Sequence, residues 1–189
     1  MGEAALKLKA LSSEDYLCEE ATRALKHEYV DGQVYGLAGA TDRHNRVVTN
    51  ISGHLWLATR GGACSTYTSD MKLRVQTELT HRFYYPDVMV TCKGDAHELY
   101  KVAPSLLVEV TSPSTASVDR REKLLAHESI PELRDYLIVS ADERYLERYR
   151  RDETEGWWYH EYRQDGTVKL PYLGLELTLD DIYEGLQGV

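Results

Sequence analysis

The sequence reads YYPDVMV over residues 84–90 and LLVEVT over residues 106–111. Both stretches are dominated by residues that favour β-strands, yet each contains one acid, Asp87 in the first and Glu109 in the second. Pro86 places Asp87 at a strand entrance, whereas Glu109 lies in the middle of its strand. An unpaired ionised carboxylate is costly to bury, so both acids require compensating partners. On neighbouring strands, Asp87 and Glu109 predict a site of negative potential.

A divalent cation is a partner that suits two such carboxylates. Mg²⁺ prefers oxygen ligands and keeps several waters, so Asp87, Glu109 and the main-chain carbonyl of Val110 would form a suitable partial shell. The remaining coordination positions suit phosphate oxygens and an attacking water. These residue types in this pattern indicate metal-dependent hydrolysis of a phosphodiester.

Lys123 and Glu28 are expected to complete the site. Hydrolysis benefits from a cation beside the nucleophile or the scissile phosphate, and Lys123 lies on an expected helix after the second acid. Asp119 precedes Lys123 by four residues, an interval that places both on one helix face, where the acid can orient the amine. Glu28, at the start of EYVDG (residues 28–32), is a candidate third carboxylate. Asp70 is a further candidate for the same cleft.

Helices and strands do not alternate regularly along the chain. Apolar residues at spacings of three and four indicate helices, and runs rich in Val, Tyr and Thr indicate strands. The expected helices are 13–26, 43–59 and about 117 to Pro131; the expected strands are 28–37 with a turn at Asp31-Gly32, 63–75, 82–91, 105–111, 136–139, 145–150 and 157–162. The three runs between residues 63 and 111 should be neighbours in one sheet. This order favours an α+β or mixed α/β fold.

The length of 189 residues fits one domain, residues 1–189, with a single core and a single site. No stretch approaches the run of about 20 apolar residues that a membrane-spanning helix requires. The first nine residues lack the apolar core of a secretory signal. These features predict a cytoplasmic protein without membrane contact.

Charge and cysteine content limit the function classes further. The formal net charge of −9 argues against a protein that holds nucleic acid by bulk attraction. Local Lys and Arg clusters and a bound metal ion would offset this charge. Cys18, Cys64 and Cys92 are odd in number and contain no close pair, which predicts buried reduced thiols rather than a disulfide framework or a metal knuckle.

Taken together, these motifs resemble the Uma-two family of restriction endonucleases, which belongs to the PD-(D/E)XK nuclease superfamily. The matching stretches are EYVDG at 28–32, YPDV at 85–88, LVEV at 107–110, SPST at 112–115, DRREKL at 119–124, IP at 130–131, YLIV at 136–139 and the closing residues 179–184. The resemblance therefore covers nearly the whole chain, and the motifs are specific as a set.

The resemblance implies a central mixed sheet flanked by helices, to which the late antiparallel strands are added. It also implies an Mg²⁺ or Mn²⁺ cofactor, DNA as substrate and a homodimer. By position, Asp87 and Glu109 become the metal ligands, Lys123 the catalytic lysine and Glu28 the auxiliary acid. The superfamily pattern places a lysine two residues after the second acid, where this sequence has Thr111. Similar families carry that lysine on the following helix, which Lys123 fits.

Three other hypotheses remain open at this point. A non-catalytic assembly or regulatory module on the same fold is favoured by the acidic charge and by Thr111, and it predicts no metal-stimulated cleavage. A hydrolase acting on sugars also uses an Asp and Glu pair, but it would not need Lys123. A zinc site formed by His44 or His81 with a cysteine lacks the short ligand spacing typical of zinc. His44 could instead lie near the mouth of the site.

Overall fold

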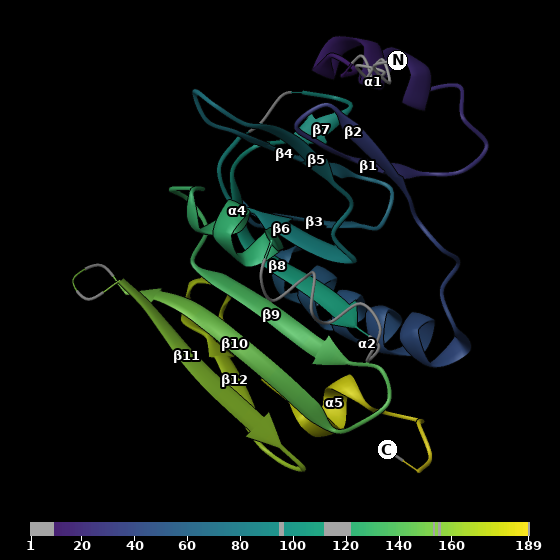
Figure 1. Cartoon of the computed structure of the whole chain (residues 1–189). Coiled ribbons are helices and arrows are strands. Elements are labelled where there is room, and N and C mark those ends of the chain that lie inside the picture. The colour runs from purple at the N-terminus through teal and green to yellow at the C-terminus, as the bar shows by residue number, and fades with distance from the viewer. Residues whose placement is uncertain (1–9, 95–96, 112–121, 153, 155, 189) are drawn as a thin grey trace, which may run out of the picture.

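A computed structural model describes residues 10–94, 97–111, 122–152, 154 and 156–188. Figure 1 shows two main sheets with helices packed on their faces. The helices are α1 (Ser13–Glu20), α2 (Asp42–Thr59), α4 (Leu124–Glu128) and α5 (Leu179–Ile182), with a 3-10 turn η2 (Pro171–Leu173). The strands are β1 (His27–Val30), β2 (Gln33–Gly36), β3 (Ser65–Thr68), β4 (Lys72–Gln76), β5 (His81–Tyr84), β6 (Val88–Thr91), β7 (Tyr100–Lys101), β8 (Pro104–Thr111), β9 (Asp135–Ser140), β10 (Tyr145–Asp152), β11 (Gly156–Arg163), β12 (Thr167–Leu170) and β13 (Leu175–Thr178).

The central sheet contains six strands in the order β11-β10-β9-β8-β6-β3. β8 and β9 run parallel, with α4 in the connection between them, and the other neighbours run antiparallel. A second sheet has the order β2-β1-β5-β4-β7, and β12 pairs with β13. The mixed central sheet, its helices and the C-terminal antiparallel strands confirm the predicted fold class.

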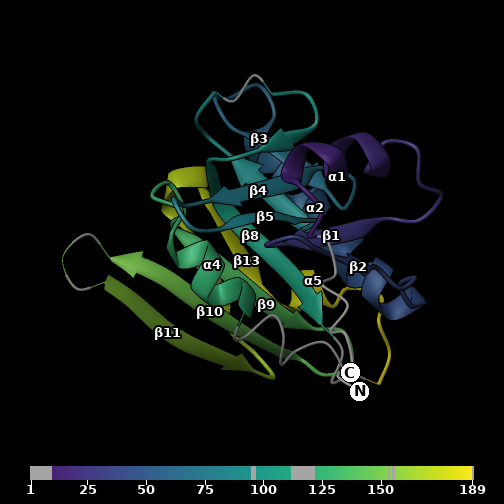
Figure 2. The same cartoon turned by 45° about the horizontal axis from the view of Figure 1, so that its top comes forward.

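Both faces of the central sheet are buried in its middle strands β6, β8 and β9. Val108 of β8 packs in one cluster with Ile51 of α2 and Ile182 of α5, whereas Leu107 packs on the other face with Ala126 of α4. Figures 1 and 2 show α2 and α4 on opposite sides of this sheet. Because side chains alternate along a strand, Glu109 shares the α4 face with Leu107.

Local sequence signals are confirmed at several turns and helix ends. Asp31 and Gly32 join β1 to β2 with φ values of 48° and 99°, the positive pair that a two-residue type I′ hairpin turn requires. α1 begins after the capping residue Ser12, and α2 begins after Thr41, whose side chain accepts from the N–H of His44 at 3.2 Å.

Two predicted strands are wrong in extent and in sheet assignment. The run 63–75 is divided into β3 and β4, and the run 82–91 into β5 and β6, with β4 and β5 in the second sheet. Pro86 has no N–H to donate, so the chain leaves one sheet at this position and enters the other. α1 is also shorter than predicted and ends at Glu20 rather than near Lys26.

The prediction of buried reduced thiols is wrong. Cys64 and Cys92 form a disulfide, and Cys18 is free and exposed. The bonded cysteines lie directly beyond the Ser65–Thr91 pair of β3 and β6. Sheet register thus brings together two residues 28 apart in sequence, which spacing rules do not detect.

The expected start of the third helix near Ser117 lies outside the described residues. Its described part, α4, ends at Glu128, before Pro131 as predicted. Among the residues whose structure is described, no helix is long and apolar enough to cross a membrane.

His127 is the most deeply buried titratable side chain of α4. It is 0% exposed, and neither ring nitrogen has a hydrogen-bond partner among the residues that the structure describes. Tyr84 and Tyr136 contact the ring edge-on, with centroids 5.6 and 4.8 Å away. Burial, with the Lys123 charge as a smaller cause, lowers the pKa of His127 to about 3. The ring is therefore neutral and packs as an aromatic side chain.

We predict that acid destabilises the protein through His127. The pKa of His127 in the folded protein lies below the ordinary value of about 6.5. As the pH falls below about 6.5, the unfolded chain binds a proton at His127 before the folded protein does. The stability contributed by neutral His127 is therefore fully present above about pH 6.5 and is lost as the pH drops towards 3. At pH 5 the loss should reach about 2 kcal/mol. His127→Phe should remove this component in urea unfolding followed by circular dichroism. Exposed His160→Phe is the control; an unchanged pH profile in His127→Phe would contradict the assignment.

Candidate active site

Two neighbouring strands bring Asp87 and Glu109 side by side. Val88 of β6 pairs with Val108 of β8, so the next antiparallel position sets Asp87 beside Glu109. Asp87 Oδ2 accepts a hydrogen bond from the N–H of Val110 at 2.7 Å. This bond fixes Asp87 at the strand entrance and places Val110, the third predicted ligand, next to it.

Lys123 lies between two acids that come from different sheets. Its Nζ is 3.1 Å from Glu109 Oε1 on β8 and 3.1 Å from Glu28 Oε1 on β1. The three side chains are only 9%, 6% and 12% exposed, which distinguishes this cluster from an ordinary surface ion pair. Glu28 also accepts from the N–H of Tyr85 at 3.2 Å. Three of the predicted site residues are therefore in direct contact.

Glu20 supports this cluster from α1. One oxygen, Oε1, accepts from the N–H of His27 at 2.7 Å and from the hydroxyl of Tyr85 at 3.1 Å. His27 precedes Glu28 in β1, and the N–H of Tyr85 donates to Glu28. Glu20 therefore accepts hydrogen bonds from two residues that position Glu28. This role of Glu20 is not predictable from the sequence, because an acid on a short amphipathic helix is typical of a solvated face.

His44 contacts Asp87, a pairing that the sequence did not predict. It lies in the first turn of α2, and its Nε2 is 3.2 Å from Asp87 Oδ2. The hydrogen bond to Asp87 raises the pKa of His44, against the opposing effect of burial. The prediction that His44 could lie near the site is consistent with this contact, although no sequence spacing pairs it with Asp87.

The donor set suits a hard divalent cation. Formal charges of −1 on Asp87, Glu109 and Glu28 and +1 on Lys123 sum to −2, which one divalent ion neutralises. Among the described residues, no three His, Cys, Asp or Glu side chains form a metal cluster. Mg²⁺ commonly uses only one or two carboxylates and keeps water in its other positions, so two acids and one carbonyl are compatible with it.

Other predicted residues lie elsewhere. Asp70 pairs with Lys26, and its side chain is 88% exposed beside α2 and β3 rather than within the cluster. Asp119 falls outside the described residues, so its expected pairing with Lys123 is not visible. The disulfide occupies Cys64 and Cys92, which removes both from the zinc hypothesis.

A mixed sheet with acids on two adjacent strands and a lysine before the crossover helix is the architecture expected of restriction-endonuclease-like proteins. A family model described as "Putative restriction endonuclease" (Uma2) matches residues 13–180. The chain belongs to this Uma2 family.

Individual relatives are consistent with this assignment. The uncharacterized Synechocystis protein slr1290 is 34% identical over 178 residues, covering 93% of both chains. A second one, sll1609, is 31% identical over 153 residues, covering 79% of this chain and 85% of its own length. A crystal structure from Anabaena variabilis, described as a "putative nuclease belonging to DUF820", shares the fold with a TM-score of 0.67 at 14% identity, covering 85% of this chain and 90% of that one.

We predict that Lys123→Met destabilises the protein by about 3 kcal/mol, because it leaves two buried acids without their shared cation. Lys169→Met is the matched control, since Lys169 pairs with Glu176 at 3.3 Å but is 67% exposed. The control should lose less than about 1 kcal/mol in urea unfolding. Equal losses of stability in the two variants would show that the buried cluster stabilises the protein no more than an exposed ion pair does.

Proposed function

We propose that this protein is a metal-dependent endonuclease that hydrolyses phosphodiester bonds in DNA, with residues 1–189 acting as one domain. The observation that supports this most is the buried contact of Lys123 with Glu109 and Glu28. Burying three charged side chains in one place has a stability cost that an unspecialised core would avoid. Membership of a family described as restriction endonucleases agrees with the proposal.

The proposed roles follow from the contacts. Asp87, Glu109 and the Val110 carbonyl would hold Mg²⁺ or Mn²⁺, which when bound lowers the pKa of a coordinated water and polarises the phosphoryl oxygens. Lys123 supplies a positive charge beside the scissile phosphate and counters the charge that develops on its oxygens. Glu28 orients Lys123 through the 3.1 Å contact.

A non-catalytic module on the same fold is the second candidate. Thr111, at the end of β8, occupies the position where the superfamily pattern has a lysine. The net charge of −9 also disfavours tight binding of nucleic acid. Cleavage assays separate the two candidates, since only the first requires metal-stimulated turnover.

We predict that the wild type nicks supercoiled plasmid DNA in Mg²⁺ or Mn²⁺, and that Glu109→Gln lowers the rate by at least about 100-fold because it removes one ligand charge. Glu176→Gln, on the exposed pair with Lys169, should cut at the wild-type rate. Circular dichroism checks that both variants fold. RNA is assayed in parallel, and an inert wild type on DNA and RNA in all metals would favour the module instead.

We also propose that the protein is a homodimer formed through the edge strand β11. This strand has eight residues, lies at one end of the central sheet and, within the described parts of the chain, pairs only with β10. It contains no Lys or Pro, the residues that commonly protect an edge, and it exposes Trp158 and Tyr159 by 56% and 48%.

The dimer proposal predicts the mass in solution. Sedimentation equilibrium at micromolar concentration should give twice the chain mass of 21.6 kDa for the wild type. Trp158→Lys should shift the protein towards monomer, because it introduces a charge into the pairing edge. Trp56→Lys, at a tryptophan exposed to a similar extent on α2, should leave the dimer intact. A monomeric wild type would refute the proposal.

A further inference from the structure

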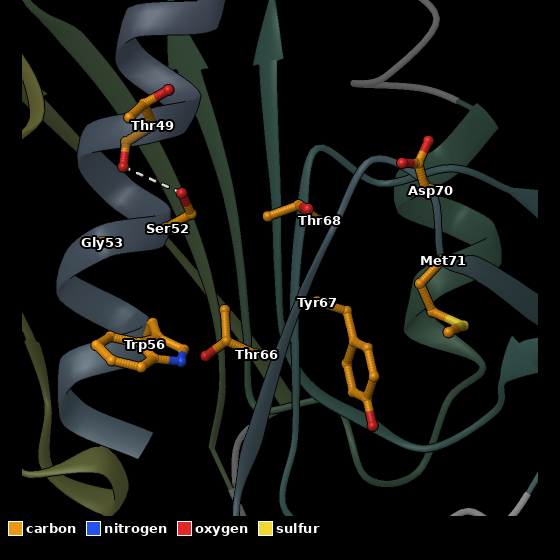
Figure 3. A pocket seen from close by; sticks show the side chains of 9 residues that line it. All are labelled: Thr49, Ser52, Gly53, Trp56, Thr66, Tyr67, Thr68, Asp70 and Met71. Carbon is orange, nitrogen blue, oxygen red and sulfur yellow. Dashed lines mark hydrogen bonds between the residues drawn. The ribbon is translucent and has the colours of Figure 1, made fainter. Parts of the chain in front are cut away.

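An open groove of about 610 Å³ lies between α2 and the edge strand β3. Thr49, Ser52, Gly53 and Trp56 line it from α2, and Thr66 and Thr68 line it from β3. Figure 3 shows the indole of Trp56 turned towards Thr66, with Thr49 and Thr68 at the other end of the groove. The site assigned above does not use these residues.

Trp56 gives the groove an aromatic surface that water can reach. Its side chain is 54% exposed, although an indole of this size is normally mostly buried. Gly53, one turn earlier on α2, has no neighbour within 4 Å of the position that a Cβ would occupy. The space beside the indole is therefore open, and the lining of the groove is mainly apolar.

The groove leads to the proposed active site. Thr68 at its far end pairs with Val88, the residue after Asp87, and the N–H of Ser69 donates to the Asp87 carbonyl at 3.2 Å. On the other wall, α2 carries both Trp56 and His44, which contacts Asp87. His44 and Trp56 are 12 positions apart, which corresponds to about 18 Å of helix, the length of about five stacked nucleotides.

Positive side chains lie at both ends of the groove. The Arg60 guanidinium lies 5.6 Å from the centre of the Trp56 ring. At the active-site end, Lys26 and Lys72 lie 5.7 and 5.2 Å from the ring of Tyr85, and Lys26 pairs with Asp70 on the groove wall. Because Asp70 neutralises Lys26, Arg60 and Lys72 are the cations near the groove that suit a phosphate chain, whereas the chain as a whole is acidic.

We infer that this groove binds a single strand of nucleic acid, with an unpaired base stacked on Trp56 and the strand running towards Asp87. A base inside a duplex is already stacked on both faces, so only an unpaired base can use the indole. Stacking also supplies affinity that does not depend on net charge, which an acidic protein needs. The inference rests on the proposed nuclease function and specifies its substrate as a strand with unpaired bases, which negatively supercoiled plasmid DNA exposes where its duplex is locally unwound.

The test is a fluorescence titration with a ten-nucleotide oligothymidylate in EDTA, so that binding is measured without cleavage. Wild type and Trp158→Phe should show quenching, and Trp56→Phe should lose most of it. Trp158 is the matched control because it is 56% exposed and lies on β11. With a labelled strand, Trp56→Ala should bind at least about fivefold more weakly than wild type, and Tyr35→Ala, at a tyrosine that is 51% exposed on β2, should bind as wild type does.

Three probes define the ligand. A ten-base-pair duplex and thymidine monophosphate should bind much more weakly than the strand, the first because its bases are stacked and the second because it cannot span the groove. Oligouridylate distinguishes RNA from DNA, and tight binding of either single strand supports the inference. Equal affinity for duplex, an unaffected Trp56→Ala variant, or no binding of either strand would overturn it. Binding through Trp56 without cleavage in Mg²⁺ would refute the nuclease proposal and leave the groove assignment standing.

Discussion

The position of Lys123 between Glu28 and Glu109 is the interaction on which the rest of the site depends. Each partner comes from a different layer of the molecule: Glu28 from the second sheet, Glu109 from the central sheet, and Lys123 from the residue that precedes α4. Their two contacts of 3.1 Å tie these layers together at a buried point. Because removing Lys123 would leave Glu28 and Glu109 without the cation that they share, the two ion pairs hold the three side chains in place before any cofactor is bound.

The surrounding contacts continue this arrangement outwards. Asp87 accepts from the N–H of Val110 and contacts His44, so the first turn of α2 lies against the site at Asp87. Glu20 holds the strand segments on either side of Glu28. Beyond Asp87, the groove between α2 and β3 offers a route for a polymer, and the aromatic surface there lies where the strand would leave the site. Metal chemistry, charge placement and substrate shape are thus linked through neighbouring elements.

Much of this could be predicted from the sequence, and the reasons are local. Acids inside apolar strand segments are costly, so Asp87 and Glu109 were conspicuous, and the Asp-Gly pair at 31–32 specified its hairpin turn. The strand runs 63–75 and 82–91 were misassigned because β propensity does not say which sheet a strand joins. The Cys64–Cys92 bond and the His44 contact depend on sheet register and helix packing, which bring together residues that no sequence spacing relates.

Glu28 was predicted from the sequence in part, whereas its contacts depend on strand pairing. Its residue type and the resemblance to a known family placed it near the site, but only the pairing of β1 with β5 brings it to the N–H of Tyr85 and to Lys123.

The central claim is that Asp87 and Glu109 share one divalent ion beside Lys123. Electron paramagnetic resonance of a Mn²⁺ titration tests it most directly: we predict a single saturable site per chain that Asp87→Asn abolishes. Saturable binding that is unchanged in Asp87→Asn, or no bound Mn²⁺ in the wild type, would contradict this account.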